Sequence, residues 1–581
     1  MPTAVPTTEI TGAGKLDTTW WKRAVIYQVY PRSFADSNGD GIGDLPGIID
    51  RLDYLHTLGV DAIWLSPFFT SPQADNGYDI SDYRDVDPAF GTLADLDRLI
   101  EGVHARGMRL VMDLVVNHSS DEHPWFVESA SSPDNPKRDW YWWRPPREGF
   151  VGGTPGAEPT DWESFFSGPA WTWHEPTGEY YLHLFSTKQP DLNWENEAVR
   201  RAVYEMMNWW LDRGVDGFRM DVINMISKEL PLRDTAGAAA DAPSPFICGP
   251  RIHEFLQEMN AAVFGGRTGQ FVTVGEMPGV TVEQAELFTD PSRHELDMVF
   301  QFEHVGLDHG PGGKWDPKPL ELRELKASLA RWQKGLARTG WNSLYWNNHD
   351  QPRAVSRFGN DDEHWEKSAQ ALGAVLHLQR GTPYVYQGEE LGMTNAPLRD
   401  AAEFRDIESI NYYAHAVTDL GDDGAAVLDR MRHSARDNAR TPMQWRAEPQ
   451  GGFTTGTPWI DPNPNHATIN AATQLGVPGS VFEFYRALIA LRHSEPVVVN
   501  GDFTMLAPEH PALFAYDRKL DGVTVRVLAN LSDDALDVAT IEGLELAGWA
   551  GAGRLLGNYS DRGGEAGWEL RPWEVRVLRR G

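Results

Sequence analysis

The chain of 581 residues has one cysteine, Cys248, and no long apolar run. A single thiol cannot form an intramolecular disulfide or a cysteine-based metal site. No stretch approaches the roughly 18 uninterrupted apolar residues of a transmembrane helix, and the first residues lack the basic and apolar segments of a secretory signal peptide. These absences predict a cytoplasmic protein that does not associate with membranes.

Basic residues are also scarce, because 52 Lys and Arg face 84 Asp and Glu and give a formal charge of -32. A surface of this sign repels phosphate backbones and anionic lipid surfaces. Nucleic acid is therefore excluded as a partner. By contrast, 23 Trp residues exceed what packing alone requires. Part of this aromatic surplus is expected to line a ligand cleft.

Short runs rich in Val, Ile and aromatic residues alternate with amphipathic helical stretches, a pattern typical of a parallel sheet with helical crossovers. Eight strands are predicted, at 24–34, 62–67, 109–115, 217–222, 271–276, 298–303, 342–350 and 382–389. Helices are predicted between them, at 45–58, 93–105, 196–213, 320–337 and 363–379. The fold class is thus α/β, with eight βα units forming a TIM barrel.

Two stretches depart from this alternation. Residues 119–189 are rich in Trp, Pro and Gly and carry no clear helix, which indicates a subdomain inserted after the third strand. After a helix near 481–492, alternating apolar and polar residues predict a C-terminal antiparallel β-sandwich. The predicted domains are an N-terminal tail at 1–19, the barrel at 20–118 and 190–495, the inserted subdomain at 119–189, and the sandwich at 496–581.

Four predicted strands end in polar residues, in the segments DLVVNH, GFRMD, VGE and NNHD. In a TIM barrel such ends converge on one mouth, where polar residues are typically catalytic. A single Asp at a strand end more often caps a helix, but several buried ionisable groups at one mouth are costly unless a site uses them. The group comprises Asp113, Asn117, His118, Arg219, Asp221, Glu276, His349 and Asp350.

This set of side chains suits glycoside hydrolysis, which needs one ionised and one protonated carboxyl group. Arg219 lies two residues before Asp221 on the same face of its strand and can keep that carboxylate ionised. Glu276 needs the opposite environment. We expect Asp350 to raise the pKa of Glu276 by like-charge repulsion.

These four segments, in this order and spacing, resemble the conserved regions of the α-amylase superfamily (glycoside hydrolase family thirteen), and QPDLNW at 189–194 resembles its additional region. The resemblance covers about residues 20–580. It implies a retaining double displacement with Asp221 as nucleophile, Glu276 as general acid/base and Asp350 as stabiliser. The residues implied to contact the same glucose are Asp75, Tyr78, His118, Gln189, Arg219 and His349.

The segments GGKWD, RTGWNSLYWNNHDQPR and RDNARTPMQW are similar to the oligo-1,6-glucosidase and dextran glucosidase branch of that superfamily. This likeness implies that Arg436 closes the glucose pocket, where it can pair with Asp75, while Phe166 supplies an apolar wall or packs inside the subdomain. Val222 is the residue type that the branch tends to carry where α-1,6 bonds are cleaved. The expected substrates are short oligosaccharides with terminal α-1,6-linked glucose, and terminal α-1,4-linked glucose is a second candidate linkage.

Three alternatives stay open at this point. An α-glucosidase that prefers α-1,4 bonds, or a transglucosylase or sucrose isomerase, would use the same covalent intermediate. Sucrose isomerases typically carry an RLDRD-like stretch where this chain reads GLDHGPGGKWD, which disfavours that activity. A non-catalytic carbohydrate-binding subunit would typically lack the carboxylates.

The segment DSNGDGIGD at 36–44 places oxygen side chains at alternating positions around glycines, as a hard cation prefers, although Asx-turns have the same composition. With the resemblance, we expect a structural Ca²⁺ site, or a Mg²⁺ site, and no organic cofactor. Its ligands would be Asp36, Asn38, Asp40, the Ile42 carbonyl and Asp44. The expected assembly is a monomer or a small homo-oligomer.

Overall fold

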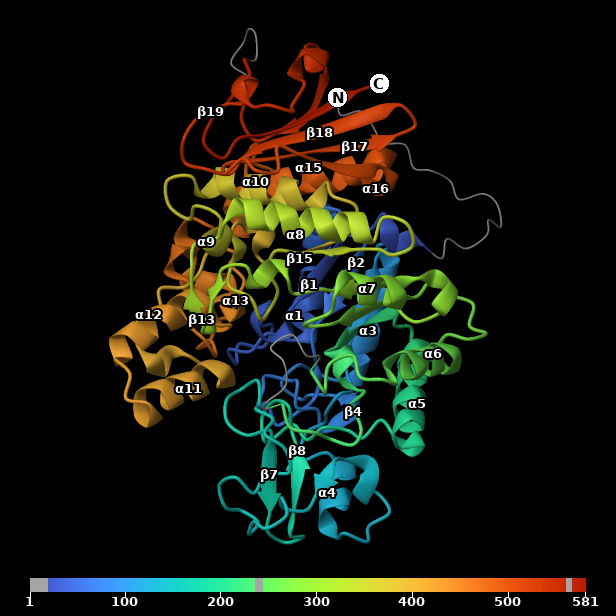
Figure 1. Ribbon diagram of the computed structural model, residues 1–581. Coiled ribbons are helices and arrows are strands. Elements are labelled where there is room, and N and C mark those ends of the chain that lie inside the picture. Colours follow the sequence, from blue (N-terminus) through green and yellow to red (C-terminus); the bar gives the residue numbers. More distant parts are fainter. Residues whose placement is uncertain (1–18, 236–243, 561–566) are drawn as a thin grey trace.

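The computed structural model describes residues 19–235, 244–560 and 567–581 (Figure 1). The predicted tail at 1–19 lies outside these residues except for Thr19. No helix in the described part of the chain is both long and apolar enough to cross a membrane. The inserted subdomain and the C-terminal sheet lie at opposite ends of the molecule, with the barrel between them (Figure 1).

All eight predicted barrel strands form, and every neighbouring pair is parallel. Their order in the sheet is β11-β10-β9-β5-β2-β1-β15-β14. A parallel bridge from Val299 to Asn342 joins the two edges and nearly closes the barrel, confirming the predicted fold class. The strands are β1 (Ile26–Val29), β2 (Ala62–Leu65), β5 (Arg109–Val115), β9 (Gly217–Asp221), β10 (Val272–Glu276), β11 (Met298–Phe300), β14 (Ser343–Leu344) and β15 (Thr382–Tyr386).

The crossover helices follow from local sequence signals. In α5 (Glu197–Arg213) the Asn196 side chain accepts a hydrogen bond from the Ala198 N–H, and Gly214 ends the helix with φ of 113°, a conformation that glycine adopts readily. The predicted helix at 45–58 is two helices, because the chain turns at Asp50 and Arg51. The others are α1 (Leu45–Ile49), α2 (Leu52–Leu58), α3 (Leu93–Ala105), α6 (Ile252–Val263), α7 (Val282–Thr289), α8 (Leu322–Gly335), α10 (Trp365–His377) and α15 (Val481–Ser494).

The inserted subdomain contains a three-stranded antiparallel sheet, β6 (Trp143–Arg144), β8 (Glu179–Leu182) and β7 (Trp171–His174). The expectation that this region holds no helix is wrong, since α4 (Pro124–Ser131) forms there. Pro124 occupies its first position and the His123 ring accepts from the Trp125 N–H, which are the signals of a helix start. Trp142 and Trp143 are buried, as packing of a small subdomain requires.

Two further excursions from the barrel were not predicted. The hairpin β12 (His309–Gly310) and β13 (Gly313–Pro317) follows β11. The helices α11 (Ile407–Tyr413) and α12 (Gly424–Ser434) follow β15 and project from the barrel beside this hairpin (Figure 1). The rings of Trp315 and Tyr412 stack at 4.3 Å and 4°, which fixes the hairpin on α11.

The C-terminal sheet is antiparallel, in the order β16-β17-β18-β22-β20. One face packs on the barrel helices, and the other faces the two-stranded sheet β19-β21 through a separate apolar core that includes Leu513, Leu528 and Trp549. The strands are β16 (Asp502–Leu506), β17 (Leu513–Leu520), β18 (Val523–Asn530), β19 (Leu536–Asp537), β20 (Gly553–Gly557), β21 (Glu569–Leu570) and β22 (Val575–Arg580).

Candidate active site

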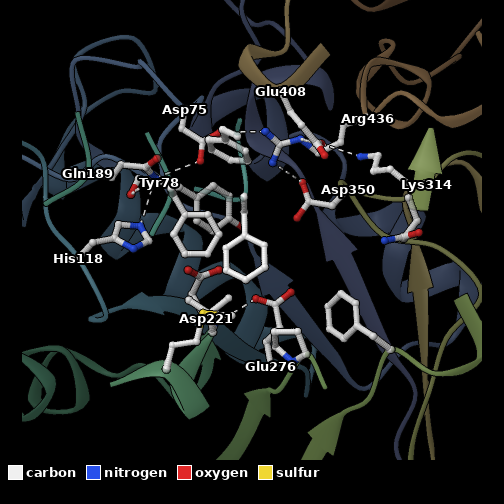
Figure 2. Close-up of a pocket in the computed structure, with 18 residues that line it drawn as sticks. Asp75, Tyr78, His118, Gln189, Asp221, Glu276, Lys314, Asp350, Glu408 and Arg436 are labelled. Atoms are coloured by element: carbon white, nitrogen blue, oxygen red, sulfur yellow. Dashed lines mark hydrogen bonds and ion pairs between the residues drawn. The ribbon is translucent and has the colours of Figure 1, made fainter. Parts of the chain in front are cut away.

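A cavity of about 270 Å³ opens at the carboxyl ends of the barrel strands. Figure 2 shows its carboxylates and basic groups converging from several strands and loops. Of the residues predicted for catalysis and substrate binding, Arg219 and His349 lie behind the wall. The others line the cavity: Asp75, Tyr78, His118, Phe166, Gln189, Asp221, Val222, Glu276, Asp350 and Arg436.

Asp221 and Glu276 bind the same guanidinium. Arg219 Nη1 lies 2.7 Å from Asp221 Oδ1, and Nη2 lies 2.5 Å from Glu276 Oε1. The predicted pairing of Arg219 with Asp221 is therefore present. The expected absence of a cation beside Glu276 is wrong, because β9 and β10 are neighbours in the sheet and the planar guanidinium presents separate donors to each carboxyl group.

The Asp221 carboxyl group is buried beside a second acid. Burial and the adjacent Glu276 carboxylate raise the pKa of Asp221 well above its ordinary value, while Arg219 opposes this rise. Asp113 adds a further like charge, and it binds Arg219 Nη1 at 2.9 Å. Arg219 thus compensates three buried carboxyl groups, those of Asp113, Asp221 and Glu276.

Val222 combines a strained backbone with a position beside the pair. Its φ of 35° lies in the left-handed region, which β-branched residues rarely adopt. In this conformation the Val222 N–H donates to Glu276 Oε2 at 3.2 Å, and the side chain lines the cavity. The strain therefore serves to aim a backbone donor at Glu276.

One end of the cavity is blocked. Arg436 Nη2 lies 3.1 Å from Asp75 Oδ1, and its guanidinium covers the Phe166 ring at 4.9 Å. Gln189 Nε2 donates to Asp75 Oδ2 at 3.1 Å and lies 3.2 Å from the His118 ring. Burial raises the pKa of Asp75 to about 7, against the lowering effect of Arg436, and lowers the pKa of His118 to about 4. His118 is therefore neutral near pH 7.

Asp350 is held ionised by its neighbours. Its Oδ1 lies 3.2 Å from Arg436 Nη1 and 2.8 Å from Arg440 Nη2. Although burial raises the pKa of Asp350, His349 and the two arginines hold it well below its usual range. Burial also lowers the pKa of His349 to about 3, so His349 is neutral near pH 7. The low pKa of Asp350 is therefore due to the two arginines.

His349 acts on the cavity through Tyr78. The two rings stack at 5.2 Å, and the Tyr78 hydroxyl lies 2.6 Å from His349 Nε2. The other ring nitrogen, Nδ1, lies 2.8 Å from Gln28 Nε2 and so acts as the acceptor in that contact. Nε2–H is then the donor in the contact with Tyr78 or with Asp350 Oδ2 at 3.2 Å.

With the geometry established, comparison with known proteins is decisive. Residues 28–501 match the family model described as the alpha amylase catalytic domain. An oligo-1,6-glucosidase of Parageobacillus thermoglucosidasius is 53% identical, over 97% of this chain and 99% of that protein. The chain belongs to the α-amylase family of glycoside hydrolases.

Two solved structures of α-amylase family members superpose closely. A Bacillus licheniformis trehalose-6-phosphate hydrolase has a TM-score of 0.91 at 43% identity, covering 96% of this chain and 99% of that one. A trehalulose synthase has a TM-score of 0.90 at 42% identity, covering 97% and 100%. One scaffold of the family thus carries enzymes named for different reactions, so side chains in the cavity must distinguish them.

Several residues of this α-amylase family site were not predicted. Lys314 on β13 pairs with Glu408 on α11 at 2.6 Å, and both line the cavity mouth. Neither lies at the end of a barrel strand, and the helix that carries Glu408 was itself not predicted. Lys314 stands in the GGKWD segment, the one sequence signal that pointed to this wall. The other additional lining residues are Phe165, Phe185, Met225, Pro278, Phe302 and Gln351.

The loop at 36–44 lies apart from the cavity. Asp36 accepts from the backbone N–H groups of Asn38, Gly39 and Gly41, and the Asn38 and Asp40 side chains accept from N–H groups two residues later. The loop thus has Asx-turns, the alternative that the composition allowed. In the described part of the chain, no group of three or more His, Cys, Asp or Glu is placed to hold a metal ion.

Proposed function

We propose that the protein is a retaining, exo-acting α-glucosidase that hydrolyses terminal α-1,6-linked glucose from short oligosaccharides such as isomaltose and panose. The observation that carries this proposal is the Asp221 and Glu276 pair on one guanidinium, in a cavity blocked at one end by Arg436 and Asp75. The relative named oligo-1,6-glucosidase, 53% identical along nearly the whole chain, supports the linkage.

The proposed reaction uses the two carboxyl groups in turn. Asp221 attacks the anomeric carbon while Glu276 gives its proton to the departing glycosidic oxygen, so one carbon–oxygen bond forms as the other breaks. Glu276, now ionised, removes a proton from water, and the resulting hydroxide displaces Asp221 from the anomeric carbon. Two displacements at one carbon retain its configuration. Retention requires the carboxyl groups to lie about 5–5.5 Å apart.

The blocked end supports exo-action. A terminal glucose in this cavity would present its hydroxyls to carboxylates and guanidinium groups held in fixed positions by mutual ion pairs, and its ring to the Phe166 face. Because Asp75 and Arg436 close the space behind that sugar, a chain could not continue past it. An open groove would instead accept the interior of a polysaccharide.

The charge of the cavity lining favours a neutral substrate over a phosphorylated one. Of the described charged side chains that line the cavity, Lys314 and Arg436 are basic, and the acidic ones are Asp75, Asp221, Glu276, Asp350 and Glu408. Both basic groups already pair with carboxylates, at 2.6 Å for Lys314 with Glu408 and 3.1 Å for Arg436 with Asp75. A dianionic phosphate would meet net repulsion, which favours neutral oligosaccharides.

Transfer of glucose to a sugar remains the competing activity, because a trehalulose synthase shares the scaffold. Incubation with isomaltose, panose, maltose and sucrose, with products separated over time, tests the proposal. Free glucose should form fastest from isomaltose and panose, and little sucrose should be consumed. Accumulation of trehalulose or isomaltulose from sucrose would instead assign an isomerase.

We also propose that the loop at 36–44 binds a structural Ca²⁺ ion through Asp36, Asn38, Asp40, the Ile42 carbonyl and Asp44. The donor types suit a hard cation, because carboxylate and amide oxygens keep a lone pair while accepting the backbone hydrogen bonds of their Asx-turns, although the three carboxylates would have to move together to bind one ion. A bound ion would stabilise this loop, which Thr454 contacts through its hydroxyl on Asp36. For location we propose the cytoplasm, since a chain with one cysteine needs no oxidising compartment.

A further inference from the structure

Arg353 lies outside the cavity, yet it holds the segment that supplies the cavity's arginines. It is completely buried, and within the described part of the chain its guanidinium donates only to backbone carbonyls. Nη1 donates to Gln387 O at 2.6 Å and Nε to Asn438 O at 3.2 Å. Nη2 donates to Ala439 O at 2.9 Å and Thr441 O at 3.4 Å.

Three of these carbonyls belong to one short segment. Helix α13 (Asp437–Arg440) is preceded directly by Arg436 and ends in Arg440, and both arginines bind Asp350 Oδ1. The carbonyls of 438 and 439 therefore lie between the two residues that hold Asp350, and the carbonyl of 441 directly follows the second of them. A shift of this segment would move Arg436 and Arg440 together.

Arg353 itself follows Asp350 by three residues, so it ties the loop after β14 to the segment that carries its partners. Among the described residues no carboxylate forms an ion pair with Arg353. Its guanidinium is met by these four carbonyls and by the face of the Tyr386 ring, 5.2 Å from the ring centroid. A buried cation without a counter-ion is costly and persists where it fixes a geometry. A lysine is a point charge and could not reach carbonyls on both sides of the segment.

We propose that Arg353 is a positioning residue, which sets the distance of Arg436 and Arg440 from Asp350 by anchoring the backbone between them. Among the described residues, none of its hydrogen-bond partners lines the cavity, so it acts through this segment. The inference rests on the proposed function only in requiring that the cavity bind a terminal glucose, whatever its linkage.

Arg492 offers a matched control. It is also buried and donates to four backbone carbonyls, those of Lys22, Arg23, His377 and Gly381. These lie at the amino ends of β1 and β15, on the opposite face of the barrel from the cavity. Arg492→Lys should therefore lower the melting temperature much as Arg353→Lys does, without changing the cavity.

The test measures kcat and KM for p-nitrophenyl α-glucoside, which reports glucose release independently of linkage. Arg353→Lys should lower kcat/KM about tenfold or more, chiefly through KM, while Arg492→Lys changes it less than about twofold. In an Arg436→Ala background the effect of Arg353→Lys on kcat/KM should shrink, because only the contact of Arg440 with Asp350 remains for Arg353 to position.

The proposal would be overturned if Arg353→Lys lowered kcat/KM in the Arg436→Ala background by as much as in wild type. It would also be overturned if Arg492→Lys lowered kcat/KM by as much as Arg353→Lys. If Arg353→Lys does not fold, Tyr386→Phe replaces it, because the Tyr386 hydroxyl donates to the same Ala439 carbonyl at 2.8 Å. Tyr386→Phe should raise KM with kcat kept, and an unchanged KM would contradict the inference. Wild-type turnover in the same assay separately tests the proposed function.

Discussion

The guanidinium of Arg436 lies 3.1 Å from the carboxylate of Asp75, although 361 positions separate the two residues in the chain. Asp75 follows β2 and Arg436 lies beyond β15, so the ion pair joins loops that follow the two strands on either side of β1. It closes one end of the cavity, where Glu408 Oε2 also lies 3.3 Å from Arg436 Nε. Exo-action therefore depends on a contact between residues that are far apart in the sequence.

Removing one partner of this pair tests its role. Asp75→Asn keeps the side-chain shape but removes a negative charge that balances the buried Arg436 guanidinium. It also replaces a charged hydrogen-bond acceptor for a sugar hydroxyl by a neutral one. We expect kcat/KM for isomaltose to fall about 10²-fold, equivalent to roughly 2.7 kcal/mol. Asp53→Asn, which removes a pair with Arg106 where Asp53 is 85% exposed, should leave it unchanged. A Asp75→Asn enzyme within threefold of wild type would refute the closed-end account.

The fold could be read from the sequence because each barrel strand carries its own periodicity, and the strand ends carried Asp221, Glu276 and Asp350. Contacts that depend on pairing between distant loops could not be read in this way. Arg219 was assigned to Asp221 from their spacing on one strand, but its contact with Glu276 depends on which strands are neighbours. Lys314 and Glu408 meet only because a hairpin after β11 packs on a helix after β15.

Linkage preference should depend on Val222. Thr is also β-branched, so Val222→Thr keeps the backbone cost of the positive φ and exchanges one methyl for a hydroxyl at the cavity wall. Such an exchange typically shifts selectivity by about 1–3 kcal/mol. We expect the ratio of kcat/KM for isomaltose to that for maltose to fall at least about fivefold. An unchanged ratio would remove Val222 from the account of linkage.

The Lys314 and Glu408 pair should control rejection of phosphate. Wild-type enzyme should hydrolyse trehalose 6-phosphate at least about 10³-fold less efficiently than isomaltose, since Lys314 and Arg436, the basic lining residues among those described, both have carboxylate partners. Glu408→Gln frees Lys314 from its ion pair and removes one negative charge. The ratio of kcat/KM for isomaltose to that for trehalose 6-phosphate should therefore fall at least about tenfold. Kinetics on both substrates would measure this. An equal ratio in wild type and Glu408→Gln would show that shape, not charge, excludes the phosphate.

Glu389 should make the protein less stable at alkaline pH. It is buried, accepts from the Tyr485 hydroxyl at 3.0 Å, and its other oxygen has no hydrogen-bond partner. Burial raises the pKa of Glu389 from 4.5 to about 8. Because the folded state then holds a proton that the unfolded state has lost, this contribution to stability is full below about pH 4.5 and disappears as pH rises through 8.

Glu389→Gln removes that ionisation. Its melting temperature should match wild type near pH 5 and exceed it at pH 9, by an amount equivalent to about 1–3 kcal/mol. Differential scanning calorimetry across this range measures the difference. Exposed Glu545 is unaffected by burial, so Glu545→Gln serves as the control. Parallel curves for wild type and Glu389→Gln would show that Glu389 ionises freely.

The central claim is that Asp221 and Glu276 carry out a double displacement at one anomeric carbon. Proton NMR of the first glucose released from isomaltose tests it directly, because mutarotation is slow enough to identify the anomer before it equilibrates. The account predicts α-glucose as the first product, and no turnover in Asp221→Asn. Initial release of β-glucose, or activity that survives replacement of both carboxyl groups by amides, would contradict it.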